Sequence, residues 1–181
     1  MKVQCSKAQL IKPSVFYKDS FIKGYLEFQK EGMNIEAEIE YIDSHFLEFT
    51  NALTNFSKKK WYNPWFIPET IYWLVENEKF LGRVSIRHRL NKNYYNFKGH
   101  IGYAVIPSQR NKGHGNTILR LALIEAEKLG MTRVLVTCDS NNIFSKKIIE
   151  NNGGVYENSK EDIDKTIKLR YWIEIKNVSN L

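Results

Sequence analysis

The residues with the clearest chemical role lie between Arg110 and Gly115, in the string Arg-Asn-Lys-Gly-His-Gly. Gly113 and Gly115 lack side chains, so several backbone N–H groups there can converge on one anion. Arg110 and Lys112 add positive charge to the same loop. If the loop opens a helix, the helix dipole contributes roughly half a positive charge more. The segment therefore predicts a binding site for a phosphate group.

A strand and a helix must position this loop. Ile101–Ile106, which precedes the loop, is rich in branched and aromatic residues, a composition typical of a strand. From Asn116 onward apolar residues recur with helical spacing, and Gly130 stands where such a helix would end. We therefore expect a strand, a basic glycine loop and an amphipathic helix in succession.

The remaining sequence predicts a mixed α/β domain. Alternating apolar residues indicate strands, whereas apolar residues three or four apart indicate helices. Strands are expected at Val3–Leu10, Thr70–Val75, Phe80–Arg89, Arg133–Cys138, Val155–Ser159 and Thr166–Ile175. Helices are expected from Ser14 to Gly32, from Ile42 to Phe56 and from Asn142 to Asn152. A right-handed helical crossover would make the strands at 101–106 and 133–138 parallel.

Two aromatic segments precede these central elements. Tyr17, Phe21, Tyr25 and Phe28 recur at helical spacing, which indicates a stripe that faces the core. Trp61–Pro68, with the sequence WYNPWFIP, contains two prolines and cannot form a regular helix or a central strand. We expect an ordered loop there that either caps the core or lines a pocket for an acceptor molecule.

The composition indicates a single soluble domain over residues 1–181. Hydrophobic residues make up 43% and charged residues 26% of the chain, which excludes a disordered protein. No apolar run approaches the roughly 20 residues of a membrane span, and the N-terminus lacks a secretory signal core. We therefore expect a cytoplasmic protein without a membrane partner. Cys5 and Cys138 have no histidine ligands beside them, so we expect free thiols and no metal site.

The formal charge of +7 raises nucleic acid as a binding partner. The positive charges are nevertheless scattered, and the run Lys58–Lys60 contains no arginine. A solvated helix end explains this run, so we expect no nucleic-acid partner. A modest positive charge also suits a ligand that carries several phosphates.

The glycine loop resembles the pyrophosphate loop of the GNAT superfamily of acyl-CoA-dependent N-acyltransferases. It reads R-x-x-G-x-G, which differs from the dinucleotide and nucleotide-triphosphate loops. The string from Thr137, TCDSNNIFSKKIIENNGG, resembles the second cofactor-contacting motif of that superfamily, N-x-x-[AS]. IRHRLN at Ile86–Asn91 is similar to a group of predicted bacterial acetyltransferases of undefined substrate. The resemblance covers most of the chain.

This resemblance implies both the fold and the cofactor site. The fold would be a GNAT-like mixed, mostly antiparallel sheet of about six or seven strands, with a splayed central pair and helices on both faces. The loop would hold the pyrophosphate of acetyl-CoA, and the pantetheine arm would lie between the splayed strands. A ligand at the carboxyl ends of parallel strands also follows the general rule for open α/β sheets. The residues assigned to coenzyme A are Val105, Ile106, Arg110, Asn111, Lys112, Gly113, His114, Gly115, Asn116, Asn142 and Ser145.

The implied reaction is direct attack of a neutral amine on the thioester, which requires removal of a proton from the amine and protonation of the thiolate. Many family members carry a tyrosine acid seven residues after the asparagine, but this chain has Ile149 at that position. Candidate substitutes are Tyr103, Tyr156 and Cys138. A thiolate is a good leaving group, so a dedicated acid is also dispensable in principle.

His88 and His100 are the candidate bases because an imidazole titrates near neutral pH. We expect both histidines at the central strands, with His100 directly before the strand that begins at Ile101, and a structural role is the alternative. Arg87 and Arg89 flank His88 and would share the opposite face of a strand. An arginine on the pocket side would suit an acceptor that carries a carboxylate or a phosphate.

These features together predict an N-acetyltransferase that moves an acetyl group from acetyl-CoA to a primary amine. The acceptor would be a small molecule or the terminus of a peptide or protein. Ile149 keeps open a second interpretation, a non-catalytic acyl-CoA-binding or regulatory module. Dimerisation is common in the superfamily, so a homodimer is a further expectation, although no segment marks its interface.

Overall fold

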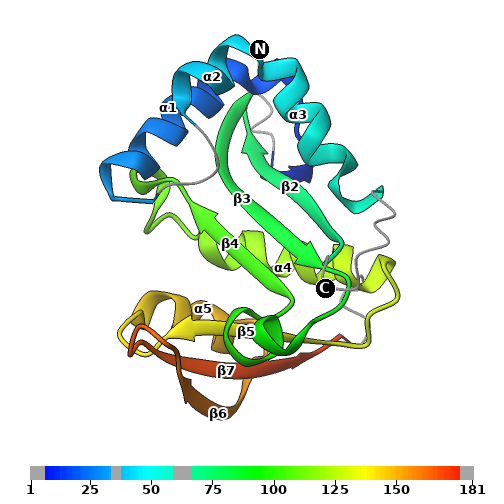
Figure 1. The fold of residues 1–181 in the computed structure, drawn as a ribbon, viewed down its shortest axis with the longest axis vertical. Coiled ribbons are helices and arrows are strands. Elements are labelled where there is room, and N and C mark those ends of the chain that lie inside the picture. Colours follow the sequence, from blue (N-terminus) through cyan, green and yellow to red (C-terminus); the bar gives the residue numbers. More distant parts are fainter. Residues whose placement is uncertain (1–6, 34–37, 59–66, 176–181) are drawn as a thin grey trace.

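A computed structural model describes residues 7–33, 38–58 and 67–175 of the chain. Its centre is a seven-stranded sheet in the order β1-β2-β3-β4-β5-β7-β6 (Figure 1). The strands are β1 (Gln9–Ile11), β2 (Glu69–Glu76), β3 (Lys79–Arg87), β4 (Ile101–Val105), β5 (Arg133–Asp139), β6 (Val155–Glu161) and β7 (Ile167–Glu174). β4 and β5 run parallel, and the other neighbouring pairs of these strands are antiparallel. The predicted mixed, mostly antiparallel sheet is confirmed.

Helices cover both faces of this sheet, as predicted. They are α1 (Lys18–Lys30), α2 (Ile39–Ser44), α3 (Phe46–Asn55), α4 (His114–Lys128) and α5 (Ile143–Asn151). Short helical turns occur at Val15–Tyr17, Phe56–Lys58, Tyr94–Lys98 and Pro107–Gln109. The first three helices pack on one face of the sheet, and α4 and α5 pack on the other (Figure 1).

An aromatic core joins α1–α3 to the sheet. Phe21 of α1 stacks on Trp73 of β2 with ring centroids 4.6 Å apart. Phe46 of α3 contacts the Phe21 ring edge to face, at 5.5 Å. Such ring pairs contribute about 0.5–1.5 kcal/mol each beyond the burial of their area. Tyr25 and Phe28 are also buried, so the predicted aromatic stripe of α1 does face the core.

On the opposite face, the apolar stripe of α4 lies against the centre of the sheet. Ile118, Leu119, Ala122 and Ala126 are fully buried there. Two of these residues are alanines, so the helix axis approaches the strands closely. This packing holds the N-terminus of α4 just beyond the carboxyl end of β4. The helix begins at His114, two residues before the predicted start.

The predicted helix from Ile42 to Phe56 is instead two helices, α2 and α3. The chain leaves helical geometry at His45, where φ is −119° and ψ is 37°. The Ser44 hydroxyl donates a hydrogen bond back to the Glu40 carbonyl (2.7 Å), and serine favours such local bonds over a continued helix. The break lets α3 turn toward β2, which a single straight helix could not do.

The ends of the central strands also differ from the prediction. β3 ends at Arg87 rather than Arg89, and His100 precedes β4. The prediction that His88 lies on a central strand was therefore wrong, whereas His100 directly precedes its strand, as expected. The first strand begins at Gln9 rather than Val3, and residues 1–6, with Cys5, lie outside the described residues.

Part of the predicted aromatic loop at Trp61–Pro68 also lies outside the described residues, which resume at Ile67. Ile67 is buried, and the Pro68 carbonyl accepts a hydrogen bond from the His88 N–H (2.9 Å). Within the described part of the chain, no helix combines the length and apolar character needed to cross a membrane.

The parallel pair at the centre of the sheet is short. β4 and β5 are matched through Ile101 and Val136, and then the two strands diverge (Figure 1). By contrast, β3 and β4 stay paired from Ile86 and Ile101 to Gly82 and Val105. The splayed central pair that the resemblance implied is therefore present.

Candidate active site

A cavity of about 290 Å³ opens where β4 and β5 diverge. Gly102 and Tyr103 form one wall, and Cys138 and Asp139 lie on the other. The remaining lining residues come from the ends of neighbouring elements: Arg87, Phe97, Lys98, Ile101, Thr137, Asn142, Ser145 and Lys168. We call this space the β4–β5 cavity. Ligands of open α/β sheets bind at such a place, beyond the carboxyl ends of parallel strands.

Backbone groups of β4 point into the β4–β5 cavity. The Ile106 N–H donates to the Leu81 carbonyl (3.0 Å), and bonded residues alternate along an antiparallel ladder. The even-numbered residues of β4 therefore pair with β3, and the N–H and C=O groups of Tyr103 and Val105 face β5, which has already turned away. Ile106 was expected to bond the cofactor arm, but it uses its N–H within the sheet.

The glycine loop lies at the open end of this divergence, and its two glycines have different roles. Gly113 adopts the left-handed conformation (φ 84°) and caps α4, with no other atom near the place a side chain would take. At Gly115 a side chain would collide with Ile148 of α5, so this glycine allows the two helices to pack closely. The first N–H groups of α4, at His114, Gly115 and Asn116, have no carbonyl partner within the helix and can receive an anion.

The two basic residues of the loop make contacts within the protein. Arg110 donates two hydrogen bonds to the Glu31 carboxylate (2.9 and 2.7 Å) and one to the Val105 carbonyl (3.1 Å). Lys112 donates to the Ser108 carbonyl (2.9 Å). Arg110 thus ties the loop to the end of α1, and its positive charge is shared with Glu31. Asn111, also assigned to the cofactor, has a φ of 60°, which asparagine tolerates better than most residues.

The start of α5 closes the opposite side of the cavity. The Asn142 side chain caps this helix by accepting a hydrogen bond from the Ser145 N–H (2.9 Å). The Ser145 hydroxyl then lies 3.1 Å from the Tyr103 hydroxyl across the divergence. Three residues predicted from two separate motifs therefore meet at one point in the cavity.

Tyr103 is the one predicted acid or base, among Tyr103, Tyr156, His88 and His100, that lines the β4–β5 cavity. Burial raises the pKa of Tyr103 to about 12, so its hydroxyl keeps its proton and acts as a donor. Tyr156 lies exposed on β6, with its ring against Tyr171 (5.6 Å between centroids).

Two further residues bear on the choice of acid. Cys138 also lines the β4–β5 cavity, and burial raises the pKa of its thiol to about 11. Ile149 is fully buried in the core on the α4 face, so the position where the family resemblance implied a tyrosine is apolar packing in this chain. Tyr103 of β4 therefore places a hydroxyl group at the cavity, whereas Ile149 of α5 is part of the core.

His100 lies beside the cavity but is held in one tautomer. Its Nδ1 accepts a hydrogen bond from the Leu135 N–H (2.9 Å), so the neutral ring carries its proton on Nε2. Burial, with the positive charges of Arg87 and Arg133, lowers the pKa of His100 to about 4. The only lone pair of the neutral ring is already engaged, so this geometry favours a hydrogen-bond donor over a base.

His88 lies on the other face of the sheet. Its Nε2 is 2.8 Å from the Thr70 hydroxyl. Glu69, the neighbour of Thr70 on β2, is instead 3.5 Å from Arg87, which lines the cavity. Adjacent strand residues point to opposite faces, so Thr70 and His88 face away from the cavity.

Charged side chains that the motifs did not predict also reach the cavity. They are Lys98, Asp139 and Lys168, and Asp139 forms an ion pair with Lys168. Asp139 ends β5 at its carboxyl end, a position where functional residues gather, so its place in the chain was a usable signal. Lys168 comes from β7, and no local pattern could link it to this site. The sequence predicted Arg87 only as a contact for a carboxylate or a phosphate of the acceptor.

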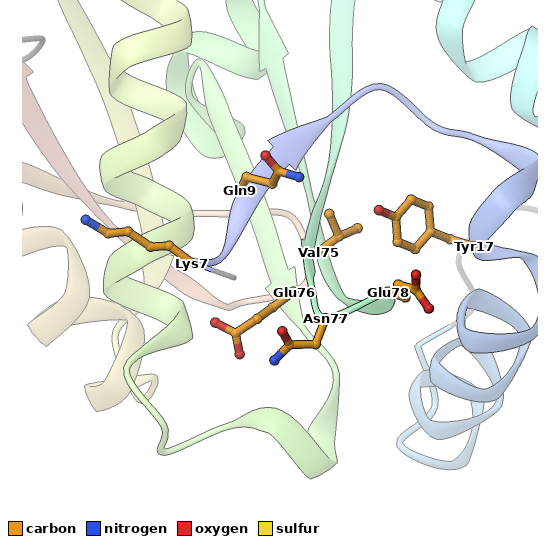
Figure 2. Close-up of a pocket in the computed structure, with 7 residues that line it drawn as sticks. All are labelled: Lys7, Gln9, Tyr17, Val75, Glu76, Asn77 and Glu78. Carbon is orange, nitrogen blue, oxygen red and sulfur yellow. The ribbon is translucent and has the colours of Figure 1, made fainter. Parts of the chain in front are cut away.

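A second cavity, of about 480 Å³, lies beside the turn that joins β2 to β3. Figure 2 shows Tyr17 turned toward Val75, whereas the Lys7 amino group points away from the space. None of the residues assigned to catalysis or cofactor binding lines this cavity. Within the described ranges, no group of three or more histidine, cysteine or acidic residues is arranged to hold a metal ion.

Comparison with known sequences agrees with these observations. A family model described as an acetyltransferase (GNAT) domain matches residues 25–155, which include β2 to β5 and the glycine loop. No curated protein sequence matches the chain.

Solved structures show the same fold at low sequence identity. The microcin C7 self-immunity acetyltransferase MccE, solved with acetyl-CoA and AMP, is 16% identical, with a TM-score of 0.67 over 94% of this chain and 93% of that one. A Salmonella typhimurium acetyltransferase that modifies the N-terminal serine of a 50S ribosomal subunit protein is 13% identical, with a TM-score of 0.68 over 94% and 96%. A spermidine N-acetyltransferase chimera from Vibrio cholerae and hSSAT is 14% identical, with a TM-score of 0.64 over 97% and 100%.

Proposed function

The chain belongs to the GNAT family of acetyltransferases, and from this premise we propose that it transfers an acetyl group from acetyl-CoA to a primary amine by direct attack. The observation that carries the proposal is the β4–β5 cavity, where Tyr103, Asn142 and Ser145 lie together between the diverging strands. The whole chain, residues 1–181, would act as one catalytic domain.

The described residues fit the cofactor in two ways. The open space at Gly113 and the unpaired N–H groups at the start of α4 suit a pyrophosphate. The N–H groups of Tyr103 and Val105 and the Tyr103 carbonyl face the gap between β4 and β5 and can pair with an extended chain that carries amide groups, whereas the Val105 carbonyl accepts from Arg110. Asn142 and Ser145 border the same gap from α5.

When bound, acetyl-CoA supplies an activated acetyl group as a thioester. The chain must then place an amine beside that group, favour the neutral form of the amine and supply a proton for the sulfur. Arg87 and Lys98 contribute positive charge to the cavity, and neighbouring positive charge lowers the pKa of an ammonium group. This arrangement favours a neutral amine: the ammonium loses one proton to solvent before attack, and the nitrogen releases a second proton to solvent as the amide bond forms and the C–S bond breaks.

Tyr103 is the proposed proton donor. Its hydroxyl keeps its proton at neutral pH and hydrogen bonds to the Ser145 hydroxyl, which can return a proton from solvent to the tyrosine. The backbone N–H of Tyr103 faces the same gap and can stabilise negative charge on a carbonyl oxygen. No covalent enzyme intermediate is required, so Cys138 has no role as a nucleophile.

The comparison structures include one enzyme that acts on spermidine and one that acts on a protein N-terminus. Both acceptors present a primary amine, which supports an amine acceptor for this chain. Incubation of the protein with acetyl-CoA and pooled amines, followed by detection of free thiol, tests the proposal. Thiol release that depends on an added amine is the expected result.

Ile149, a core residue in the place of the usual tyrosine, favours a second candidate function, a non-catalytic acyl-CoA-binding module. Calorimetry on the same protein distinguishes the two functions. Tight acetyl-CoA binding without turnover of any amine would contradict the enzyme and support the binding module.

A further inference from the structure

We infer that the acceptor carries a carboxylate close to its amine, as a free α-amino acid does, and that Arg87 binds this carboxylate. The inference rests on the proposed function and names the substrate class of the same cavity. Arg87 ends β3 and lines the β4–β5 cavity, where 14% of its side chain remains accessible. No predicted cofactor contact involves this residue.

The sheet directs Arg87 into the cavity. Val84 and Ile86 of β3 are buried in the core under α4, so Arg87 emerges on the opposite face, as does Ser85. Gly102 lies beneath the guanidinium, and the position that a side chain would take there is 3.5 Å from Arg87 Nη2. The absence of a side chain at Gly102 therefore leaves the guanidinium directly above the backbone of β4.

Neighbouring groups hold the guanidinium in place but leave part of it unused. Arg87 Nη1 donates to the Gly99 carbonyl (3.1 Å), and the Tyr94 ring lies 4.6 Å from the guanidinium carbon. The buried Nε–H has no hydrogen-bond partner among the described residues, because the nearest Glu69 oxygen is 3.5 Å away. Because Nε forms an ion pair with the Glu69 carboxylate, the Nη1–Nη2 end above Gly102 is the part of the guanidinium that can bind a ligand carboxylate.

The charge of the cavity points to the same kind of ligand. Three cationic side chains, Arg87, Lys98 and Lys168, line it together with one carboxylate, Asp139, which is paired with Lys168. Glu69, outside the lining, is paired with Arg87, so the five charges leave one net positive charge. This excess of positive charge attracts an anionic acceptor and repels one that carries several ammonium groups. A polyamine is therefore disfavoured, in contrast to the spermidine enzyme of similar fold.

The size of the cavity restricts the acceptor further. A space of about 290 Å³ lies at the lower limit of small-molecule sites, which occupy roughly 300–1,000 Å³. Part of it must also receive the acetyl end of the donor. A free amino acid fits these limits and carries its carboxylate one carbon from the amine. A protein N-terminus lacks that charge, because its first carboxyl group is in a peptide bond.

The experiment compares acceptors in matched pairs, with thiol release from acetyl-CoA as the readout. Each α-amino acid is assayed beside its carboxamide, and phosphoethanolamine is included as an amine that carries a phosphate. We expect at least one amino acid to exceed its carboxamide by tenfold or more in kcat/KM. The amine of the carboxamide is less basic than the amine of the free amino acid, so a larger fraction of it is neutral at a given pH. This difference favours the carboxamide and therefore cannot produce a preference for the amino acid.

Variants then assign the preference to Arg87. Arg87→Gln is expected to lower kcat/KM for the amino acid by about 10- to 100-fold, the range for loss of a charged hydrogen bond, and to lower kcat/KM for the carboxamide by much less. Arg89→Gln is the matched control, because Arg89 follows the end of β3 and lies outside the cavity lining. Acetyl-CoA affinity and melting temperature report whether each variant is folded.

Three results would overturn the inference. They are equal rates for wild-type protein with acids and carboxamides, an equal loss for both acceptors in Arg87→Gln, and a preference for phosphoethanolamine over every amino acid. The wild-type comparison stands even if Arg87→Gln fails to fold. Absence of thiol release with all acceptors would refute the proposed function itself, whereas release without preference for acids would refute this inference alone.

Discussion

The hydroxyl oxygens of Tyr103 and Ser145 lie 3.1 Å apart, and this hydrogen bond joins β4 to the first turn of α5 across the point where β4 and β5 diverge. It is a contact between residues 42 positions apart in the chain. The pair lines the β4–β5 cavity, and burial keeps the tyrosine protonated. Its position makes Tyr103 the first residue to test as the proton donor.

We expect Tyr103→Phe to lower kcat by about 10²-fold, the lower end of the usual contribution of an acid catalyst. The affinity for acetyl-CoA should stay within about twofold, because the phenylalanine keeps the ring and the backbone N–H. Steady-state kinetics and calorimetry check the two quantities. Tyr41→Phe is the control, since Tyr41 lies exposed on α2 far from the cavity lining. An unchanged kcat in Tyr103→Phe would remove this tyrosine from the mechanism.

Gly113→Glu should weaken acetyl-CoA binding by tenfold or more. The added carboxylate would stand beside the N–H groups at the start of α4, and the residue would also be strained at a φ of 84°. Gly113→Gln has the same size and the same strain without the charge, so the difference between the two variants isolates electrostatic repulsion. Calorimetric titration measures both. Equal affinities in the two variants would argue against a phosphate at this loop.

His100 should make the protein sensitive to acid. Its folded-state pKa of about 4 lies below the ordinary value of 6.5, so the unfolded chain binds a proton before the folded one does. The stabilising contribution is complete above pH 6.5 and is lost as the pH falls toward 4. A shift of this size corresponds to about 3 kcal/mol at most, and solvent screening of the partly exposed ring makes the loss smaller.

The variant His100→Asn tests this pH dependence, because its side-chain oxygen can accept the Leu135 N–H without titrating. Urea unfolding between pH 7 and 4 should show a shallower decrease in stability for His100→Asn than for the wild type. Parallel pH profiles for the two proteins would show that another group causes the acid sensitivity.

Gly115→Ala should destabilise the protein by about 1–3 kcal/mol, the usual cost of added volume in a packed region. The new methyl group would meet the Cδ1 end of Ile148 where α4 packs on α5. Ile148→Val removes that end of the side chain, so the double variant should recover part of the lost stability. Thermal unfolding of the wild type, the two single variants and the double variant provides a double-mutant cycle. Additive losses would mean that the two residues do not compete for the same space.

The strand, glycine loop and helix were predictable because each depends on neighbouring residues. Branched residues favour β4, glycine permits the turn at Gly113, and the apolar period of α4 continues to Ala126. The break at His45 was not predicted, because α2 and α3 have one continuous apolar pattern and the interruption is a local hydrogen bond of Ser44. Helix propensity describes the average preference of a whole segment, whereas the Ser44 hydrogen bond changes the backbone at a single residue.

The candidate catalytic residues were harder to predict because their roles depend on which face of a strand they occupy. The end of β3 at Arg87 places Arg87 at the cavity and turns His88 to the opposite face, toward Thr70. A chemical type such as imidazole carries no information about this difference. The residue type also could not show that His100 Nδ1 accepts a hydrogen bond from the Leu135 N–H.

By itself, the sequence determined the family and predicted the loop that would bind a phosphate, because the loop and its flanking elements lie within one stretch of about 30 residues, on the scale of a single strand–loop–helix unit. Only the tertiary structure decided which side chains share the cavity. Arg87, Tyr103 and Lys168 come from β3, β4 and β7, and the order of these strands in the sheet brings them together. The physical reason is that a cavity forms between strands far apart in the chain, and local preferences do not specify their pairing or their ends.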